Sequence, residues 1–111
     1  MIFASYHGVI VGMIGFLIRG RVKTEHVADI FSYYVCKKYR GGGIGSLLMG
    51  EALKEIGKSE RVRKVSLAVN SENHSAINLY EKFGFKISGK LLQELKVNGK
   101  FYDELVMEKI L

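Results

Sequence analysis

The sequence predicts an α+β domain built on a mixed β-sheet, and three observations lead to this prediction. Three β-prone segments come first along the chain. After them, the apolar residues change from strand-like to helical spacing. Near the C-terminus, two further β-prone segments flank Asn98-Gly99, a dipeptide typical of a type I′ hairpin turn. The predicted order is therefore β-β-β-α-β-α-β-β, in a single domain over residues 1–111.

Three strands are predicted before the first helix. They cover Met1 to Tyr6, Val9 to Ile18 and His26 to Cys36. His7-Gly8 offers a tight turn between the first two strands. Gly12 and Gly15 mark points of bulging or close approach in the second strand.

The first helix is predicted to follow the glycine segment at 41–45, with Gly57 as its C-cap. Its apolar stripe is predicted to contain Ile44, Leu47, Leu48, Ala52, Leu53 and Ile56. The next strand is expected from Val62 to Val69. A strand, a helix and a strand in this succession predict a parallel right-handed crossover.

The second helix is predicted to begin after Asn73, whose side chain can cap it, and to end at Gly84. Its inner face is predicted to contain Ala76, Ile77, Leu79, Tyr80 and Phe83. Phe85 to Val97 and Lys100 to Ile110 are predicted to form the closing hairpin.

The net charge is +6, and the basic residues are dispersed, which favours an ordinary solvated surface over nucleic-acid binding. Cys36 is the only cysteine, so no internal disulfide can form and a reducing compartment is expected. The longest apolar run, Val9 to Ile18, is too short to span a bilayer. We therefore expect a cytoplasmic protein that does not act at a membrane.

The most informative segment is the glycine loop, residues 39–46, which reads Tyr-Arg-Gly-Gly-Gly-Ile-Gly-Ser. A glycine loop that opens a helix points several unpaired N–H groups at one spot, where the helix dipole favours negative charge. The segment lacks the lysine of a P-loop and the third glycine of the dinucleotide fingerprint. It predicts a cradle for a phosphate or diphosphate, the alternative being a mobile turn.

Two motifs together resemble the GNAT N-acetyltransferase superfamily. The first is Arg40-x-x-Gly43-x-Gly45, between a strand and a helix, which is similar to the acetyl-CoA loop of that family. The second motif follows one strand later and reads Asn73, Ala76-Ile77, Leu79-Tyr80-Glu81-Lys82 and Gly84-Phe85. The resemblance implies the acyl-CoA N-acyltransferase fold of GNAT proteins, with acetyl-CoA as the acyl donor and no metal.

The resemblance also implies a cofactor site. Main-chain groups of Tyr34, Val35 and Cys36 are expected to pair with the pantetheine amides, with the oxyanion donor near Val35. The loop residues expected to bind the diphosphate are Arg40, Gly41, Gly42, Gly43, Ile44, Gly45 and Ser46. Arg40 adds charge, braces the loop or is simply a solvated side chain. Asn73 binds the pantetheine arm, caps the helix or does both.

The family pattern assigns Tyr80 as the acid beside the CoA sulfur; a tyrosine packed in the core is the alternative, and both can hold at once. Asp29 is a candidate base acting through water, or a solvated carboxylate at a strand end. Glu72, His74 and His26 are weaker candidates. Cys36 would suit a covalent intermediate, but direct transfer in the family favours a small packed thiol.

Family members normally begin with a strand and one or two helices before the region seen here, so the resemblance implies an N-terminally truncated form of the fold. A partner subunit, a swapped strand or a separate chain would supply the missing part, or the sequence is an incomplete form of a longer protein. A homodimer is favoured, because the first strand would otherwise leave an open sheet edge. The leading hypothesis is an enzyme that transfers acetyl from acetyl-CoA to a primary amine. The alternatives are an acetyl-CoA sensor or catalytically impaired binding module, and a basic nucleic-acid-binding domain. The acceptor is open among protein N-termini, lysines, polyamines, antibiotics and metabolites.

Overall fold

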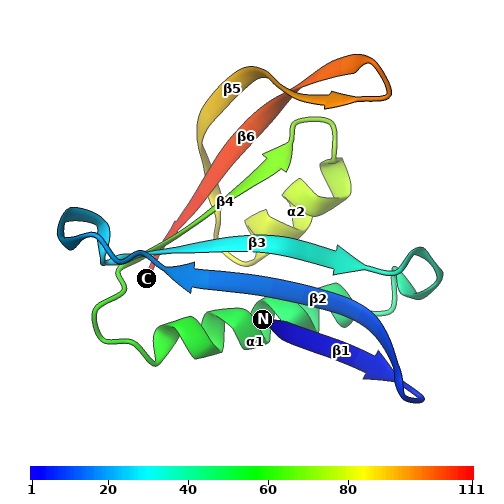
Figure 1. Cartoon of the computed structure of the whole chain (residues 1–111), viewed down its shortest axis with the longest axis horizontal. Helices are drawn as coiled ribbons and strands as arrows, with labels where there is room; N and C mark the ends of the chain where they lie inside the picture. Colours follow the sequence, from blue (N-terminus) through cyan, green and yellow to red (C-terminus); the bar gives the residue numbers. More distant parts are fainter. The chain divides into compact units, whose positions relative to one another are not determined.

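The computed structural model describes all 111 residues, which fold into two units, Met1–Arg63 and Lys64–Leu111 (Figure 1). Each unit contains three of the strands and one of the α-helices. The predicted element order is confirmed, with two short 3-10 helices added, and so is the α+β class. None of the helices has the length and apolar character needed to cross a membrane.

The first unit is an antiparallel sheet, β1-β2-β3, with the helix α1 packed against it. Its elements are β1 (Ile2–Tyr6), β2 (Val9–Ile18), η1 (Val22–Thr24), β3 (Val27–Val35), η2 (Lys37–Tyr39) and α1 (Ile44–Gly57). Gly12 allows the close approach of α1, because a Cβ at this position would lie 3.0 Å from the side chain of Leu48.

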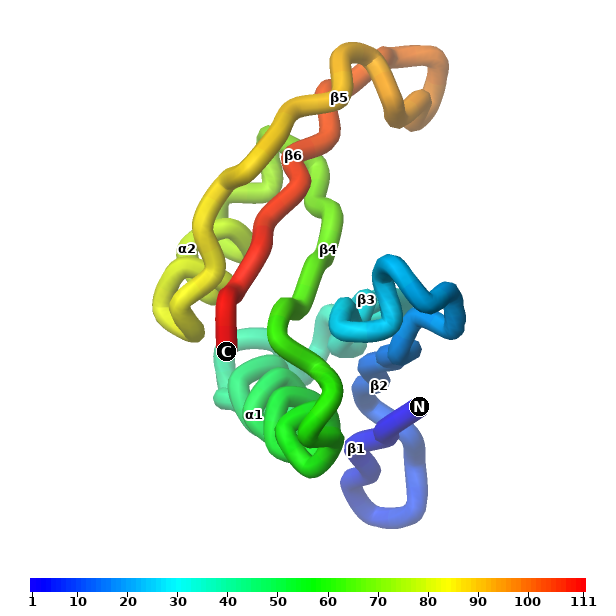
Figure 2. The backbone as a smooth tube through the Cα atoms, turned by 90° about the vertical axis from the view of Figure 1, so that its left-hand side faces the viewer, coloured from blue at the N-terminus to red at the C-terminus, as the bar shows by residue number.

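The second unit is also antiparallel, with β6 in the centre, β4 on one side and β5 on the other. Its elements are β4 (Lys64–Asn70), α2 (His74–Lys82), β5 (Lys86–Val97) and β6 (Lys100–Ile110). Figure 2 shows β5 and β6 running side by side into a curved hairpin. The predicted parallel crossover joins a strand of one unit to a strand of the other and stays a prediction.

Both predicted hairpin turns are present. His7 and Gly8 have φ values of 50° and 78°, and Asn98 and Gly99 have φ values of 51° and 78°. Positive φ at both central residues is the mark of a type I′ turn, whose twist matches the twist of the strands it joins. These dipeptides therefore determine the register of each hairpin.

The caps of α2 agree with the sequence, whereas α1 differs in two details. Asn73 Oδ1 accepts a hydrogen bond from the Ala76 N–H at 3.3 Å, and Gly84, with φ 93°, follows the end of α2. The prediction of Gly57 as a C-cap is wrong, because Gly57 is the last helical residue and Lys58 is the cap. Leu47 is 71% exposed and does not belong to the buried stripe. The side chains of α1 that are buried are Leu48, Met49, Ala52 and Ile56.

A β-bulge interrupts β3 near its end. Met13 pairs with Tyr34 and Gly15 with Phe31, so two residues of β3 stand opposite the single residue Ile14. The extra residue is Ser32, which has a left-handed φ of 49°. A bulge of this kind bends the strand and redirects the side chains after it.

The glycines of the first unit generate a stability prediction. Gly50 lies inside α1, and a Cβ there would meet no atom within 4 Å. Glycine within a helix is less favourable than alanine, so Gly50→Ala should raise the free energy of unfolding by about 0.5–1 kcal/mol in urea denaturation. The matched change Gly15→Ala should lower it, since its Cβ would lie 2.4 Å from the ring of Phe31. A loss of stability in Gly50→Ala would contradict this account.

Candidate functional site

The glycine loop contains six consecutive main-chain amides, those of residues 41–46, that have no partner within the protein. The amide of Arg40 donates to Lys37 O at 3.3 Å, and the amide of Leu47 donates to Gly43 O at 3.0 Å. The unpaired set therefore begins after η2 and ends where the helical hydrogen bonds of α1 begin. Such a set at a helix N-terminus binds anions through both its hydrogen bonds and the helix dipole.

Two glycines give the loop its shape. Gly41 has φ 85°, and Gly43, the N-cap of α1, has φ 89°. L-residues rarely adopt these values, because a Cβ would crowd the adjoining carbonyl. No protein atom lies within 4 Å of where a Cβ of either residue would stand.

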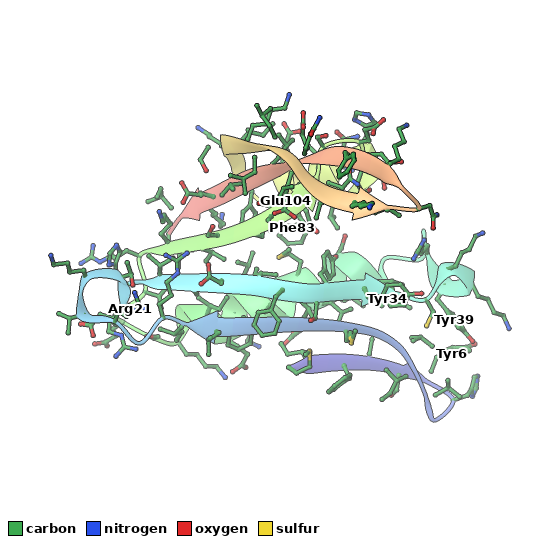
Figure 3. All side chains as sticks on the ribbon, turned by 45° about the horizontal axis from the view of Figure 1, so that its top comes forward. Tyr6, Arg21, Tyr34, Tyr39, Phe83 and Glu104 are labelled. Carbon is green, nitrogen blue, oxygen red and sulfur yellow. The ribbon has the colours of Figure 1, made fainter.

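Side chains of β3 and of the loop hold this conformation. The Tyr33 hydroxyl donates a hydrogen bond to Gly45 O in the first turn of α1. Arg40 Nε donates to Val35 O at 2.8 Å, and its guanidinium lies 5.4 Å from the centre of the Tyr34 ring. Figure 3 shows Tyr34 and Tyr39 at the end of the sheet where the loop begins. Three roles were considered for Arg40. Its hydrogen bond to Val35 O shows that it braces the loop against β3.

The main-chain groups at the end of β3 differ in the direction they face. The Cys36 amide donates to Val11 O at 2.7 Å, and Cys36 O accepts from the Tyr39 amide at 2.8 Å. Bonding direction alternates along an antiparallel ladder, so Val35, opposite Gly12, turns its N–H and C=O away from β2. By the same alternation, the groups of Tyr34 turn toward β2. Of these three residues, only Val35 directs its N–H away from β2.

Two further residues that the sequence assigned to the site, Asn73 and Tyr80, belong to the other unit, at α2. The Asn73 side chain caps the helix through the Ala76 amide and also accepts from Ser75 Oγ at 3.2 Å. Tyr80 is buried on the inner face of α2, with its ring centre 6.1 Å from that of Phe85. This burial raises the pKa of the Tyr80 hydroxyl from 10.0 to about 12. The hydroxyl therefore holds its proton throughout the neutral range.

The candidate bases are placed less favourably. Both carboxylate oxygens of Asp29 accept from Arg19, at 2.7 Å from Nε and 2.7 Å from Nη2. Asp29 is thus bound in a bidentate ion pair with Arg19. Each of the two side chains is about two fifths exposed. Glu72 and His74 lie at the start of α2, where both are exposed, and His26 is exposed beside β3. None of the four is a buried group.

Sequence reasoning missed two residues that shape the site. Ser32 carries the bulge, and Tyr33 bonds to α1. No residue-type signal marks the bulge, since serine is not typical of a left-handed φ. The tyrosine-rich end of the strand was visible, but without the bulge the alternation of faces assigns Tyr33 to the wrong side.

Comparisons with known proteins identify the family. The model of the Acetyltransferase (GNAT) family matches residues 1–85. The chain is 31% identical over 107 residues to the L-amino acid N-acetyltransferase AaaT of Escherichia coli K12, covering 96% of this chain and 65% of that protein. It is 29% identical over 91 residues to a spermidine N(1)-acetyltransferase of Vibrio cholerae, covering 82% of this chain and 53% of that protein.

A solved structure agrees with these matches. The acetyltransferase of GNAT family from Streptococcus pneumoniae superposes with a TM-score of 0.92 at 33% identity, over 98% of this chain and 65% of that chain. The chain belongs to the GNAT acetyltransferase family. The resemblance seen in the two sequence motifs is thereby confirmed. The chain spans between half and two thirds of the length of the two curated relatives.

The raised pKa of Tyr80 predicts a specific loss of stability in alkali. The unfolded chain releases this proton near pH 10, while the folded protein holds it to about pH 12. The contribution is therefore complete below pH 10 and is lost as the pH rises through 12, with a size on the order of 2 kcal/mol. Urea denaturation across this range should show a steeper loss for the wild type than for Tyr80→Phe. Parallel profiles would contradict the burial argument.

Proposed function

We propose that this chain transfers an acetyl group from acetyl-CoA directly to a primary amine. The observation that carries the proposal is the set of six unpaired amides at residues 41–46, opened by two left-handed glycines. Acetyl-CoA contains a diphosphate, the kind of anion such a cradle accepts. The residues present fit this group, because no Cβ fills the cradle. Membership of the GNAT family supports acetyl as the group that is transferred.

The proposed reaction begins with a neutral amine, so an amine with an ordinary pKa of about 10.4 must first lose a proton. Its nitrogen then attacks the thioester carbon; a C–N bond forms and the C–S bond breaks. The Val35 N–H, turned away from β2, is the proposed donor to the carbonyl oxygen during the tetrahedral stage. Both oxygens of Asp29 are bound by Arg19, so we propose that the amine proton leaves through water and not directly to this carboxylate.

Tyr80 is proposed to stabilise the departing thiolate. A hydroxyl with a pKa of about 12 is a weaker acid than a thiol, whose pKa is about 8.5, so complete proton transfer to sulfur is unfavourable. A hydrogen bond from the neutral hydroxyl lowers the energy of the thiolate without that transfer. The proton lost by the amine balances the one that CoA finally gains from water.

The names of the relatives support an amine acceptor. AaaT is an L-amino acid N-acetyltransferase, and the Vibrio cholerae relative is a spermidine N(1)-acetyltransferase. Both descriptions name acetyl transfer to nitrogen, so we propose the same for this chain. Cys36 is a free thiol, which suits the reducing compartment proposed for the protein. The proposed homodimer is tested by the mass of the protein in solution.

A charge placed in the loop tests the diphosphate cradle. Acetyl-CoA at about 100 times its Kd should stabilise the wild type by about 2.7 kcal/mol, a rise in Tm of roughly 10 °C. Gly43→Glu should abolish the rise, because its carboxylate would occupy the phosphate position and strain the left-handed backbone. The control Gly20→Glu adds the same charge at an open glycine without a positive φ and should keep the rise. An unchanged Tm rise in Gly43→Glu would refute the cradle.

A conservative change of Tyr80 tests the chemical step. Loss of one hydrogen bond to a charged sulfur should lower kcat of Tyr80→Phe roughly 10- to 100-fold, with KM for acetyl-CoA within about twofold. The readout is release of free CoA thiol with a panel of amines. Tyr6→Phe is the control, since it removes the same hydroxyl from an exposed tyrosine of β1 and keeps the ring that lies beside Tyr39. Equal turnover in Tyr80→Phe and wild type would remove Tyr80 from the mechanism, and acetyl-CoA binding without thiol release would favour a sensor.

A further inference from the structure

The second unit contains a depression of about 290 Å³ that the reaction above does not use in full. Its lining comes from the β4–α2 turn and from the β5–β6 hairpin: Asn70, Glu72, Asn73, Val97 and Tyr102. It therefore combines one carboxylate, two side-chain amides, an aromatic ring and an apolar wall. This is a composition that suits an organic cation.

Strand lengths create the depression. The pairing of β4 with β6 ends at Asn70, opposite Glu104, so the hairpin residues 97–103 extend beyond the end of β4. The β4–α2 turn is fastened beneath this extension by the Ser71 amide, which donates to Asp103 O at 2.9 Å. The Glu72 amide donates to Asn70 Oδ1 at 3.0 Å, which holds the turn that carries the carboxylate. Both walls are thus ordered by the fold.

The charges around the depression include two carboxylates that no cation of the protein neutralises. Glu72 lines it, and Glu104, labelled on β6 in Figure 3, is directly opposite Asn70 and on the same face of β6 as Tyr102. Neither takes part in an ion pair. Asp103, by contrast, is paired with Lys90 at 3.4 Å. The site offers negative charge to a ligand.

The aromatic wall already binds an ammonium group of the protein itself. Lys100 Nζ lies 5.1 Å from the centre of the Tyr102 ring, within the range of a cation–π contact. Lys96 makes a similar contact with Phe101, at 5.6 Å, but neither of those residues lines the depression. The ring of Tyr102 is therefore a surface on which a primary ammonium rests.

We propose that this depression binds a charged ammonium group of a linear di- or polyamine, between the ring of Tyr102 and the carboxylates of Glu72 and Glu104. Its role as an acceptor subsite rests on the proposed function: one end of the diamine stays charged here while the other end, neutral, is acetylated. An acceptor with a carboxylate in this place would meet the like charge of Glu72. The depression thus selects acceptors that carry a second positive charge.

Calorimetric titration without acetyl-CoA tests the subsite alone. The probes are putrescine and 1,4-butanediol, which share the same carbon chain and differ in that only putrescine carries ammonium groups. Putrescine should bind at least about fivefold more tightly, and its affinity should fall as salt is added. Equal affinity for the two ligands, or no putrescine binding, would overturn the proposal.

Matched variants locate the binding. Glu72→Gln and Glu104→Gln should each weaken putrescine binding roughly threefold to fivefold, whereas Glu94→Gln, an exposed residue of the same hairpin, should leave it unchanged. Lys100→Ala frees the Tyr102 ring and should tighten binding about threefold, more than Lys96→Ala, which removes the same charge from Phe101. The site would be refuted if Glu94→Gln weakened putrescine binding as much as Glu72→Gln and Glu104→Gln do. It would also be refuted if Lys96→Ala and Lys100→Ala changed that binding equally.

Thiol release with putrescine as acceptor separates the two proposals. Putrescine that binds but is not acetylated would refute the proposed transfer to this amine and leave the ammonium site standing. Acetylation of amines by the wild type, with unaltered putrescine affinity in Glu72→Gln and Glu104→Gln, would refute the ammonium site and leave the transferase standing.

Discussion

Six main-chain amides that the protein leaves unpaired, at residues 41–46, are the constraint on which the rest of the candidate site depends. Unpaired N–H groups are tolerated only where water or a ligand satisfies them. The chain keeps them in the open by giving Gly41 and Gly43 left-handed backbones and by starting α1 directly behind them. Tyr33 and Arg40 secure the loop to β3. An anion is the natural occupant of such an arrangement.

The bulge in β3 connects this loop to the proposed chemistry. It adds one residue to the strand, which turns Tyr33 toward α1 and Tyr34 to the opposite face. The ladder after the bulge leaves Val35 with its N–H directed away from β2. One local irregularity thus supports both the brace of the loop and the proposed oxyanion donor. Bulges recur beside active sites for this reason: they redirect a few groups without disturbing the sheet.

The second unit contributes by burial and by charge. The inner face of α2 removes Tyr80 from water, and the resulting rise of its pKa keeps the hydroxyl neutral as a hydrogen-bond donor. The β5–β6 hairpin extends beyond β4 and brings Tyr102 above the turn that carries Glu72. A neutral donor and a negative subsite on one unit are complementary to a thiolate and to a cationic amine. This complementarity underlies both proposals.

The sequence by itself determined the order of the elements, both type I′ turns, the cap at Asn73 and the glycine loop, because each depends on the conformational preferences of a few adjacent residues. Only the tertiary structure decided the rest. The bulge at Ser32, the exposure of Leu47, the ion pair that engages Asp29 and the two bonds that occupy the main chain of Cys36 all depend on segments distant in the chain. Local preference does not encode which partners such groups meet, since that is set by the pairing of strands and the packing of α1 on its sheet.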